Sequence, residues 1–332
     1  MEGGFLYERI DLWYDSKYRK SMEENMAINK TVRKILKAFS FQEIEVESAR
    51  QIANLKSINP MKIFHKTIDF NVRNQEYNVP VRLFFPRTTK RKDILGKKLP
   101  VLIFFHGGGW VTDSIDNYER ICALMADTTK YIVISVEYRL APEYKFPTGL
   151  LDCYAVAKEV FENPRFDKDK VTIMGDSAGG NLAAAVCQMA RDKKEFQPQK
   201  QILIYPVVGN DYTETSPFPS VAENGRDYLL TAGKMQDYID LYKRTDEDKQ
   251  NPYFAPILQK DLRGLPKTLV ITSEFDPLRD EGEAYARRLK EAGNEVSQYR
   301  IKDALHGFFG LGIKYYHVEE SFKYINQFLE EE

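Results

Sequence analysis

Residues 171–181 read VTIMGDSAGGN, and this stretch decides the fold. An apolar run, typical of a buried strand, ends in a serine with glycines on both sides. The alanine-rich sequence that follows, AGGNLAAAVCQMARDK at 178–193, predicts a helix. A strand, a tight turn and a helix in this order match the G-x-S-x-G turn known as the nucleophile elbow, which places Ser177 at its tip.

The small residues around Ser177 are what such a turn requires. A sharp strand-to-helix turn imposes an unfavourable backbone conformation on the serine and brings the strand and the helix close together. Gly175 and Gly179 leave room for this approach. The helix that begins at Ala178 also directs its free N–H groups and the positive end of its dipole towards the serine. Ser177 is therefore a candidate nucleophile.

The sequence on both sides of the elbow alternates between strands and helices. Continuous apolar runs, typical of strands in a parallel sheet, occur at residues 101–105, 131–138, 171–177, 201–206 and 268–276, and a last strand is expected at 296–301. Helical sequences follow at residues 118–129, 149–163, 178–193 and 281–293. Before the first of these strands, residues 63–86 predict an antiparallel hairpin. We therefore predict an α/β fold with a mostly parallel central sheet flanked by helices.

Two segments fall outside this alternation and predict a mainly helical cap. Residues 1–56 are highly charged, with apolar side chains at helical spacing between Met26 and Phe39. Residues 207–265 separate two predicted strands, although such connections usually span only ~2–6 residues. We expect an N-terminal cap segment (1–56), an α/β domain (57–206 and 266–332) and an insertion that contributes to the cap (207–265).

The composition excludes several classes of function. Lys and Arg number 48 against 49 Asp and Glu, so a net charge of -1 gives no electrostatic case for a nucleic acid or membrane partner. No apolar run approaches the ~18 residues of a membrane span, and the N-terminus does not resemble a signal peptide. The 3 widely spaced cysteines argue against a disulfide framework. We therefore expect a cytoplasmic protein.

The residues that can carry chemistry follow the strands of the predicted sheet. In open α/β sheets, ligands bind beyond the carboxyl ends of the strands. Here these ends lead into HGGG at 106–109, Ser177 and Asp276, and His306 follows the last strand. A nucleophilic serine needs a base, and the base needs a carboxylate that orients it. We expect Ser177, His306 and Asp276 to form a catalytic triad, with Asp280 as the competing carboxylate.

The triple glycine after the first parallel strand suits an oxyanion hole. Glycine lets the backbone approach a substrate closely, and backbone N–H groups stabilise the negative oxygen of a tetrahedral intermediate. We expect Gly107 and Gly108 to donate together with Ala178, although the choice among the three glycines, Gly109 included, stays open. His106 is expected to order this loop through hydrogen bonds. A phosphate-binding turn is disfavoured, because HGGGWVTDS lacks the lysine and the later glycine of those motifs.

Five motifs, in this order, resemble the hormone-sensitive-lipase-like branch of the α/β-hydrolase family: HGGGW, EYRLAPE, GDSAGG, DPLRDEG and HGF. The resemblance covers residues 80 to about 330, and the GDSAG form is similar to the larger bacterial subgroup. It implies a triad of Ser177, Asp276 and His306, an oxyanion hole built from the HGGG loop and Ala178, and neither a cofactor nor a metal. It also allows a homodimer through the last strand and the C-terminal helices.

The expected reaction is hydrolysis of a small carboxylic ester with a short to medium acyl chain, by way of an acyl-enzyme. Ser177 would attack the ester carbonyl and His306 would take its proton. An acetyl esterase acting on acetylated sugars, or an amidase, would use the same triad. A hydrolase-like receptor that binds a small molecule without turnover is a third alternative, although such binders commonly lose a triad residue and all three are present here.

Overall fold

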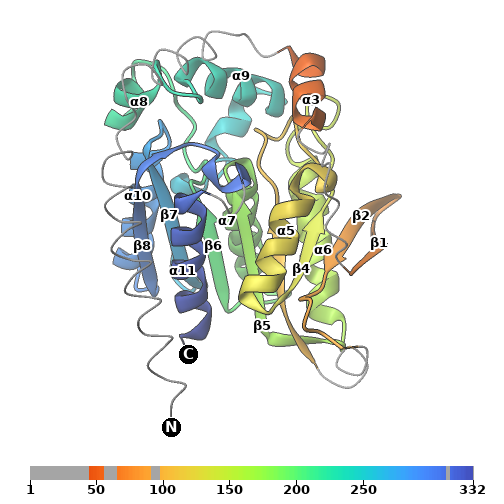
Figure 1. Ribbon diagram of the computed structural model, residues 1–332. Helices are drawn as coiled ribbons and strands as arrows, with labels where there is room; N and C mark the ends of the chain where they lie inside the picture. The colour runs from red at the N-terminus through yellow and green to blue at the C-terminus, as the bar shows by residue number, and fades with distance from the viewer. Residues whose placement is uncertain (1–44, 56–65, 91–97, 312–314, 332) are drawn as a thin grey trace.

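A computed structural model of the chain describes residues 45–55, 66–90, 98–311 and 315–331. The predicted helical pattern between residues 26 and 39 lies outside these ranges, as does most of the expected N-terminal cap segment. An eight-stranded sheet forms the centre of the molecule, and helices cover both of its faces (Figure 1).

The strands follow the order β1-β2-β4-β3-β5-β6-β7-β8 across the sheet. Their bounds are β1 Thr67–Asn74, β2 Tyr77–Phe84, β3 Leu99–Phe105, β4 Ile132–Val136, β5 Phe166–Asp176, β6 Lys200–Ile204, β7 Lys267–Phe275 and β8 Val296–Leu305. β1 pairs with β2, and β2 with β4, in antiparallel register, and all the other pairs are parallel. The mostly parallel sheet and the preceding hairpin are therefore confirmed.

The helices on the two faces of the sheet pack their apolar sides against it. The α-helices are α3 Val46–Leu55, α5 Ile115–Thr129, α6 Thr148–Glu162, α7 Ala178–Lys193, α8 Pro219–Asn224, α9 Ala232–Tyr242, α10 Arg279–Glu291 and α11 Tyr316–Glu330. Along β3, Ile103 and Phe105 join the core that includes side chains of α6, α7 and α10, whereas Leu102 and Phe104 join the core beneath α5 and α11. Because both faces of β3 are buried, its sequence is apolar throughout.

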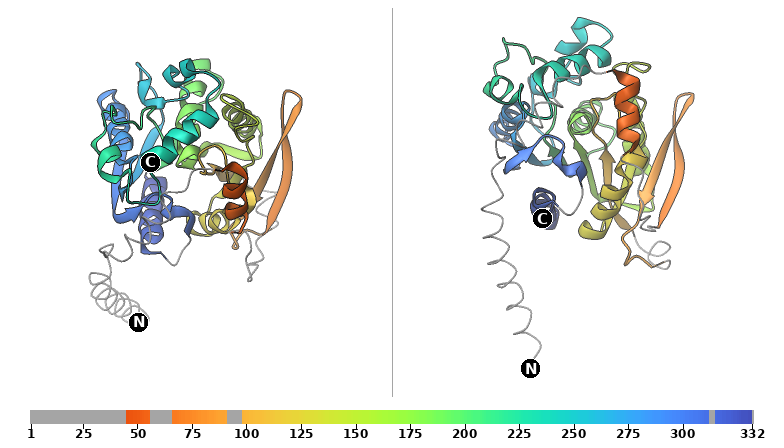
Figure 2. Two further views of the ribbon diagram at one scale, coloured as in Figure 1. Left: turned by 90° about the horizontal axis from the view of Figure 1, so that it is seen from above. Right: turned by 45° about the horizontal axis from the view of Figure 1, so that its top comes forward.

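The insertion predicted at residues 207–265 leaves the sheet between β6 and β7. It contains α8, α9 and the short 3-10 helices η1 (Asp246–Gln250) and η2 (Pro256–Leu258). Figures 1 and 2 place α8 and α9 beyond the carboxyl ends of the strands, with α3 at the same edge. Arg50 in α3 donates from Nε to the carbonyl oxygen of Val111 at 3.0 Å, which ties this helix to the loop after β3.

The last strand is longer than the sequence predicts. β8 continues past residue 301 to Leu305, and the register with β7 shifts between Ser273 and Phe275. At this shift Asp303 takes a positive φ of 56°, and its N–H donates to the carboxylate of Glu274 at 2.7 Å. The irregularity lets the polar sequence after residue 301 continue the pairing, so that the strand ends directly before His306.

Two further expectations can be compared with the structure. The three cysteines, Cys122, Cys153 and Cys187, are buried and free, as predicted for a chain without a disulfide framework. In the part of the chain that the structure describes, no helix has the length and apolar character needed to cross a membrane.

Candidate active site

Ser177 lies at the tip of the turn between β5 and α7. Its backbone has φ 55° and ψ -120°, a conformation that is strained for a residue with a side chain. A Cβ atom on Gly179 would lie 2.0 Å from the carbonyl oxygen of Phe105, and one on Gly175 would lie 2.1 Å from that of Gly179. Any side chain at either glycine would push the strand and the helix apart, which explains the G-x-S-x-G pattern physically.

The structure brings together the serine, histidine and aspartate that the sequence singled out. Ser177 Oγ lies 2.9 Å from His306 Nε2, and His306 Nδ1 lies 2.7 Å from Asp276 Oδ2. Asp276 is fully buried, whereas the side chain of His306 stays 12% exposed. A buried carboxylate on one nitrogen of an imidazole, with a hydroxyl on the other, is an arrangement that can activate the hydroxyl as a nucleophile.

The competing carboxylate, Asp280, is engaged elsewhere. One of its oxygens lies 2.8 Å from Nε of Arg279, and the other accepts the N–H of Ser220 in the insertion at 2.7 Å. Asp276, by contrast, accepts the N–H of Leu278 with Oδ1 at 2.9 Å and leaves Oδ2 for His306. The geometry therefore places Asp276, and not Asp280, against the histidine.

The loop after β3 bears the three glycines. Gly108 and Gly109 have positive φ angles of 101° and 61°. The N–H of Gly107 donates to Oη of Tyr118 at 3.2 Å, so this group is already used within the protein. Among the described residues, the N–H groups of Gly108, Gly109 and Ala178 donate to no protein atom. A ligand can therefore accept hydrogen bonds from these three N–H groups.

His106 orders this loop, as the sequence predicts. Its Nδ1 lies 2.8 Å from the carbonyl oxygen of Gly107, and the residue is fully buried. Tyr138, from the predicted EYRLAPE turn, stacks on the imidazole at 4.4 Å between ring centres and donates from its hydroxyl to the carbonyl oxygen of His106 at 2.8 Å. The histidine therefore has a local role in supporting the glycine loop.

Comparison with known proteins agrees with this geometry. The sequence profile of the α/β-hydrolase fold family matches residues 102–310, which include the glycine loop, Ser177, Asp276 and His306. The chain belongs to the α/β-hydrolase family, in its hormone-sensitive-lipase-like branch. The resemblance inferred from the five motifs is thus confirmed.

Several relatives of this α/β-hydrolase carry esterase names. An arylesterase of Saccharolobus solfataricus is 35% identical over 276 residues, which cover 82% of this chain and 85% of that protein. An ethyl acetate hydrolase of Pseudomonas putida is 33% identical over 240 residues, which cover 71% and 73% of the two chains. The solved structure of an esterase from Pyrobaculum calidifontis superposes with a TM-score of 0.79 at 34% identity, covering 91% of this chain and 98% of that one.

The insertion of this α/β-hydrolase contacts the loops on both sides of Ser177. The ring of Tyr238 in α9 lies so close to Gly109 that an added Cβ would meet its Cδ1 at 2.4 Å. Trp110 stacks on Tyr242 of the same helix, with ring centres 4.4 Å apart and planes 4° apart. On the other side, Asn224 at the end of α8 donates from Nδ2 to the carbonyl oxygen of Asp276 at 3.2 Å.

Two tyrosines beneath the site carry no sequence signal for a role there. Tyr205 ends the run QILIY and was visible only as a residue at a strand end. Tyr118 lies in the first turn of α5, where a buried aromatic residue normally indicates packing alone. In the structure both hydroxyls donate to Asp176, the residue before Ser177, at 2.9 Å from Tyr118 and 3.2 Å from Tyr205.

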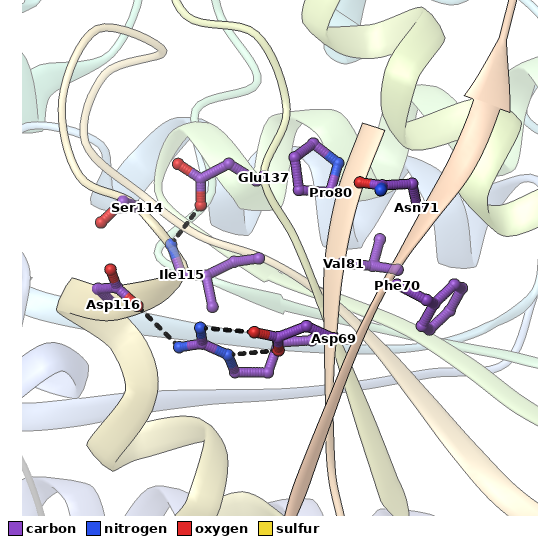
Figure 3. Close-up of a pocket in the computed structure, with 10 residues that line it drawn as sticks. Asp69, Phe70, Asn71, Pro80, Val81, Ser114, Ile115, Asp116 and Glu137 are labelled. Atoms are coloured by element: carbon purple, nitrogen blue, oxygen red, sulfur yellow. Dashed lines mark hydrogen bonds and ion pairs between the residues drawn. The ribbon is translucent and has the colours of Figure 1, made fainter. Parts of the chain in front are cut away.

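A separate pocket of 310 Å³ lies between the β1–β2 hairpin and the start of α5, and its lining includes none of Ser177, Asp276 and His306 (Figure 3). Arg82 forms ion pairs with Asp69 and Asp116 there, both at 2.7 Å. Glu137 accepts the N–H of Ile115 at 2.6 Å. The charged groups of this pocket are thus paired with groups of the protein itself. Within the described residues, no group of three or more His, Cys, Asp or Glu side chains is arranged to hold a metal ion.

Proposed function

We propose that this α/β-hydrolase is a serine carboxylesterase that hydrolyses short- to medium-chain carboxylic esters. The observation that carries the proposal is the continuous hydrogen-bonded chain from Ser177 Oγ through His306 to Asp276, at 2.9 and 2.7 Å. The arylesterase, the ethyl acetate hydrolase and the esterase structure described above support the ester as the bond that is cleaved.

In the proposed reaction, Ser177 attacks the ester carbonyl while His306 Nε2 takes the hydroxyl proton. Asp276 holds the imidazole with its other nitrogen protonated and stabilises the imidazolium that forms. The imidazolium then protonates the leaving alcohol, and an acyl-enzyme remains on Ser177. A water molecule, deprotonated by His306, attacks this acyl group, so that the carboxylic acid leaves and the serine is restored.

We assign the oxyanion hole to the N–H groups of Gly108, Gly109 and Ala178. The sequence favoured Gly107 with Gly108, but the N–H of Gly107 already donates to Tyr118, and turning it to a ligand would leave the buried hydroxyl oxygen of Tyr118 without that donor. Glycine at 108 and 109 suits this role, because both positions have positive φ angles. The negative oxygen of the tetrahedral intermediate would be stabilised by these donors most strongly in the transition state.

We further propose that α8, α9 and α3 form a cap over the carboxyl ends of the strands. The aromatic contacts of α9 with the glycine loop and the hydrogen bonds of Arg50 in α3 support this assignment. Such a cap would exclude water from the reacting ester. The cytoplasmic location and a homodimer stay predictions from the sequence.

Initial rates on p-nitrophenyl esters from acetate to palmitate test the proposal. Wild-type activity should be highest on short chains, and Ser177→Ala should lower kcat by at least ~10,000-fold with the fold intact. Ser321→Ala is the matched control, because Ser321 is also a buried serine, and its hydroxyl donates to the carbonyl oxygen of His317 in α11. A Ser177→Ala variant with the turnover of the wild type would overturn the proposal. A wild-type enzyme that cleaves amides but no ester would show that the substrate is an amide and not an ester.

A further inference from the structure

The carboxylate of Asp176 connects three loops that the proposed reaction needs. They are the turn at Ser177, the glycine loop after β3 and the loop that begins at His306. We propose that Asp176 is a positioning residue, which holds the oxyanion loop and the His306 loop in place through the hydroxyls of Tyr118 and Tyr205. This inference rests on the proposed esterase function, because it concerns the geometry of the same site.

Asp176 is an unusual residue to find in the interior. It is only 1% exposed, and its neighbours in β5 are apolar. A buried carboxylate is costly unless hydrogen bonds stabilise it. Oδ2 accepts hydroxyl protons from Tyr118 and Tyr205, whereas Oδ1 has no hydrogen-bond partner among the described residues. The two tyrosine hydroxyls are therefore the protein groups that stabilise this buried carboxylate.

The first branch runs from Asp176 to the oxyanion loop. A tyrosine hydroxyl has one proton, and Tyr118 donates it to the carboxylate at 2.9 Å. Its lone pairs are then left to accept the N–H of Gly107 at 3.2 Å. This bond fixes the direction of the peptide N–H of Gly107 and leaves the next two N–H groups as the donors of the loop. A Cβ on Gly107 would lie 2.9 Å from both Asp176 Oδ2 and Tyr118 Oη, so the loop lies directly on this pair.

The second branch runs from Asp176 through Tyr205 to the loop that bears His306. Tyr205 donates its proton to Asp176 at 3.2 Å, and its oxygen accepts the N–H of Phe309 at 3.2 Å. Phe309 lies three residues after His306, in the 3-10 helix η3 (Phe308–Leu311). The ring of Tyr205 also packs against the imidazole of His306, with ring centres 4.7 Å apart. One carboxylate thus orients hydroxyls that support both the base and the oxyanion donors.

Tyr118→Phe and Tyr205→Phe remove these hydroxyls and keep the rings. The matched control is Tyr285→Phe, because Tyr285 is fully buried and its hydroxyl accepts a hydrogen bond from Gln188 at 3.0 Å, away from the three loops. We would measure kcat and KM on p-nitrophenyl acetate, the melting temperature, and the Ki of an alkyl trifluoromethyl ketone. Such a ketone forms a tetrahedral adduct on a nucleophilic serine and places its oxygen in the oxyanion hole.

Tyr118→Phe should lower kcat ~10-fold or more, since displacing oxyanion donors by about 1 Å has effects of this size or larger. KM should stay within about twofold, and the Ki of the ketone should rise by the same factor as kcat falls. Tyr205→Phe should lower kcat in the same way. Tyr285→Phe should leave both kcat and Ki within about twofold of the wild-type values. This should hold even if its melting temperature falls as much as that of the Tyr118→Phe and Tyr205→Phe variants.

A double-mutant cycle tests whether Tyr118 acts through Asp176. Asp176→Asn replaces one acceptor oxygen with a donor, so it disturbs the same hydroxyl. The double variant should therefore lose little more than the worse single variant, and losses that multiply would contradict the proposal. Tyrosine variants with the kcat and Ki of the control would overturn it as well. A wild-type enzyme without activity on any ester would instead overturn the proposed function, before the variants are compared.

Discussion

Two loops of the active site follow parallel strands and border the same edge of the sheet, yet their backbones differ. The oxyanion loop (residues 106–113) follows β3, and the acid loop (residues 276–281, of which the last three begin α10) follows β7. Four residues of the oxyanion loop have positive φ angles: Gly108, Gly109, Trp110 and Asp113. No residue of the acid loop, all of which the structure describes, has one.

The two loops differ because one is proposed to act through backbone groups and the other through a side chain. In the oxyanion loop the proposed functional groups are backbone N–H groups, so the backbone itself must take an unusual path and glycine is required. In the acid loop the proposed functional group is the side chain of Asp276, which an ordinary turn at the start of a helix can present. A loop that works through its backbone is therefore marked by its composition, whereas a loop that works through one side chain is not.

The largest expected effect comes from replacing the two aspartates of the acid loop, one at a time, by asparagine. Asp276→Asn should lower kcat ~10,000-fold, because the amide no longer selects the useful tautomer of His306. Asp280→Asn removes a carboxylate that faces Arg279 and Ser220, so kcat should change by less than about fivefold while the melting temperature falls. Initial rates on p-nitrophenyl acetate measure both, and equal losses in the two variants would contradict the assignment of Asp276.

A pair of glycine substitutions compares the backbones directly. Gly109→Ala adds a Cβ at a φ of 61° and 2.4 Å from the ring of Tyr238, so the oxyanion loop must move and kcat should fall ~100-fold or more. Gly282→Ala, in α10, adds a Cβ 3.1 Å from Thr272 Cγ2 and 3.6 Å from Pro206 Cδ, and the φ angle there is not positive. Its kcat should stay within about threefold of the wild type. A Gly109→Ala enzyme with the kcat of Gly282→Ala would refute the proposed role of this backbone.

The smallest effect concerns stability at the end of the acid loop. Glu281 is fully buried and accepts the N–H groups of Val208 and Gly209 at 2.8 and 3.1 Å, which holds the start of the insertion. Burial raises the pKa of Glu281 from 4.5 to about 8. The folded state thus binds this proton more tightly than the unfolded state, so the stabilisation is complete below pH 4.5 and is lost as the pH rises through 8.

Glu281→Gln should therefore flatten the pH dependence of the melting temperature. Between pH 5 and pH 9, the melting temperature of the variant should rise relative to that of the wild type by ~2 °C or more. Glu223→Gln is the control, because it makes the same change at a side chain that is 56% exposed and ion-paired with Arg279. A Glu281→Gln curve parallel to that of the wild type would show that Glu281 does not titrate there.

The same contrast between backbone and side chain separates the features that could be predicted from the sequence from those that could not. The hairpin, the parallel strands and the helices between them were predictable, since each has its own periodicity and both faces of the sheet are buried. The glycine loop and the elbow at Ser177 were predictable because only small residues fit there. The sequence favoured Asp276 but left Asp280 as a competing carboxylate, because a carboxylate at the start of a helix is a common feature in itself.

Contacts that depend on the whole fold were out of reach. The bond from Tyr118 to the N–H of Gly107 joins residues of a helix and a loop, and no local pattern marks it. Without it, Gly107 was as good a donor as its neighbours. The extension of β8 to Leu305 depends on an irregular pairing with β7, which the polar sequence after residue 301 conceals. Burial and pairing of this kind are set by tertiary structure and not by local propensity.

The attachment of the insertion has a consequence for how enzymes of this architecture can be altered. Residues 207–265 leave the sheet after β6 and return at β7, and these two strands are direct neighbours in the sheet. A segment exchanged between these two points leaves the strand order unchanged. Chimeras that carry a foreign segment here would inherit their catalytic machinery from one parent and their substrate range from the other. The graft must preserve the contacts that anchor the insertion, among them those of Asn224 with the acid loop and of Tyr238 with the oxyanion loop.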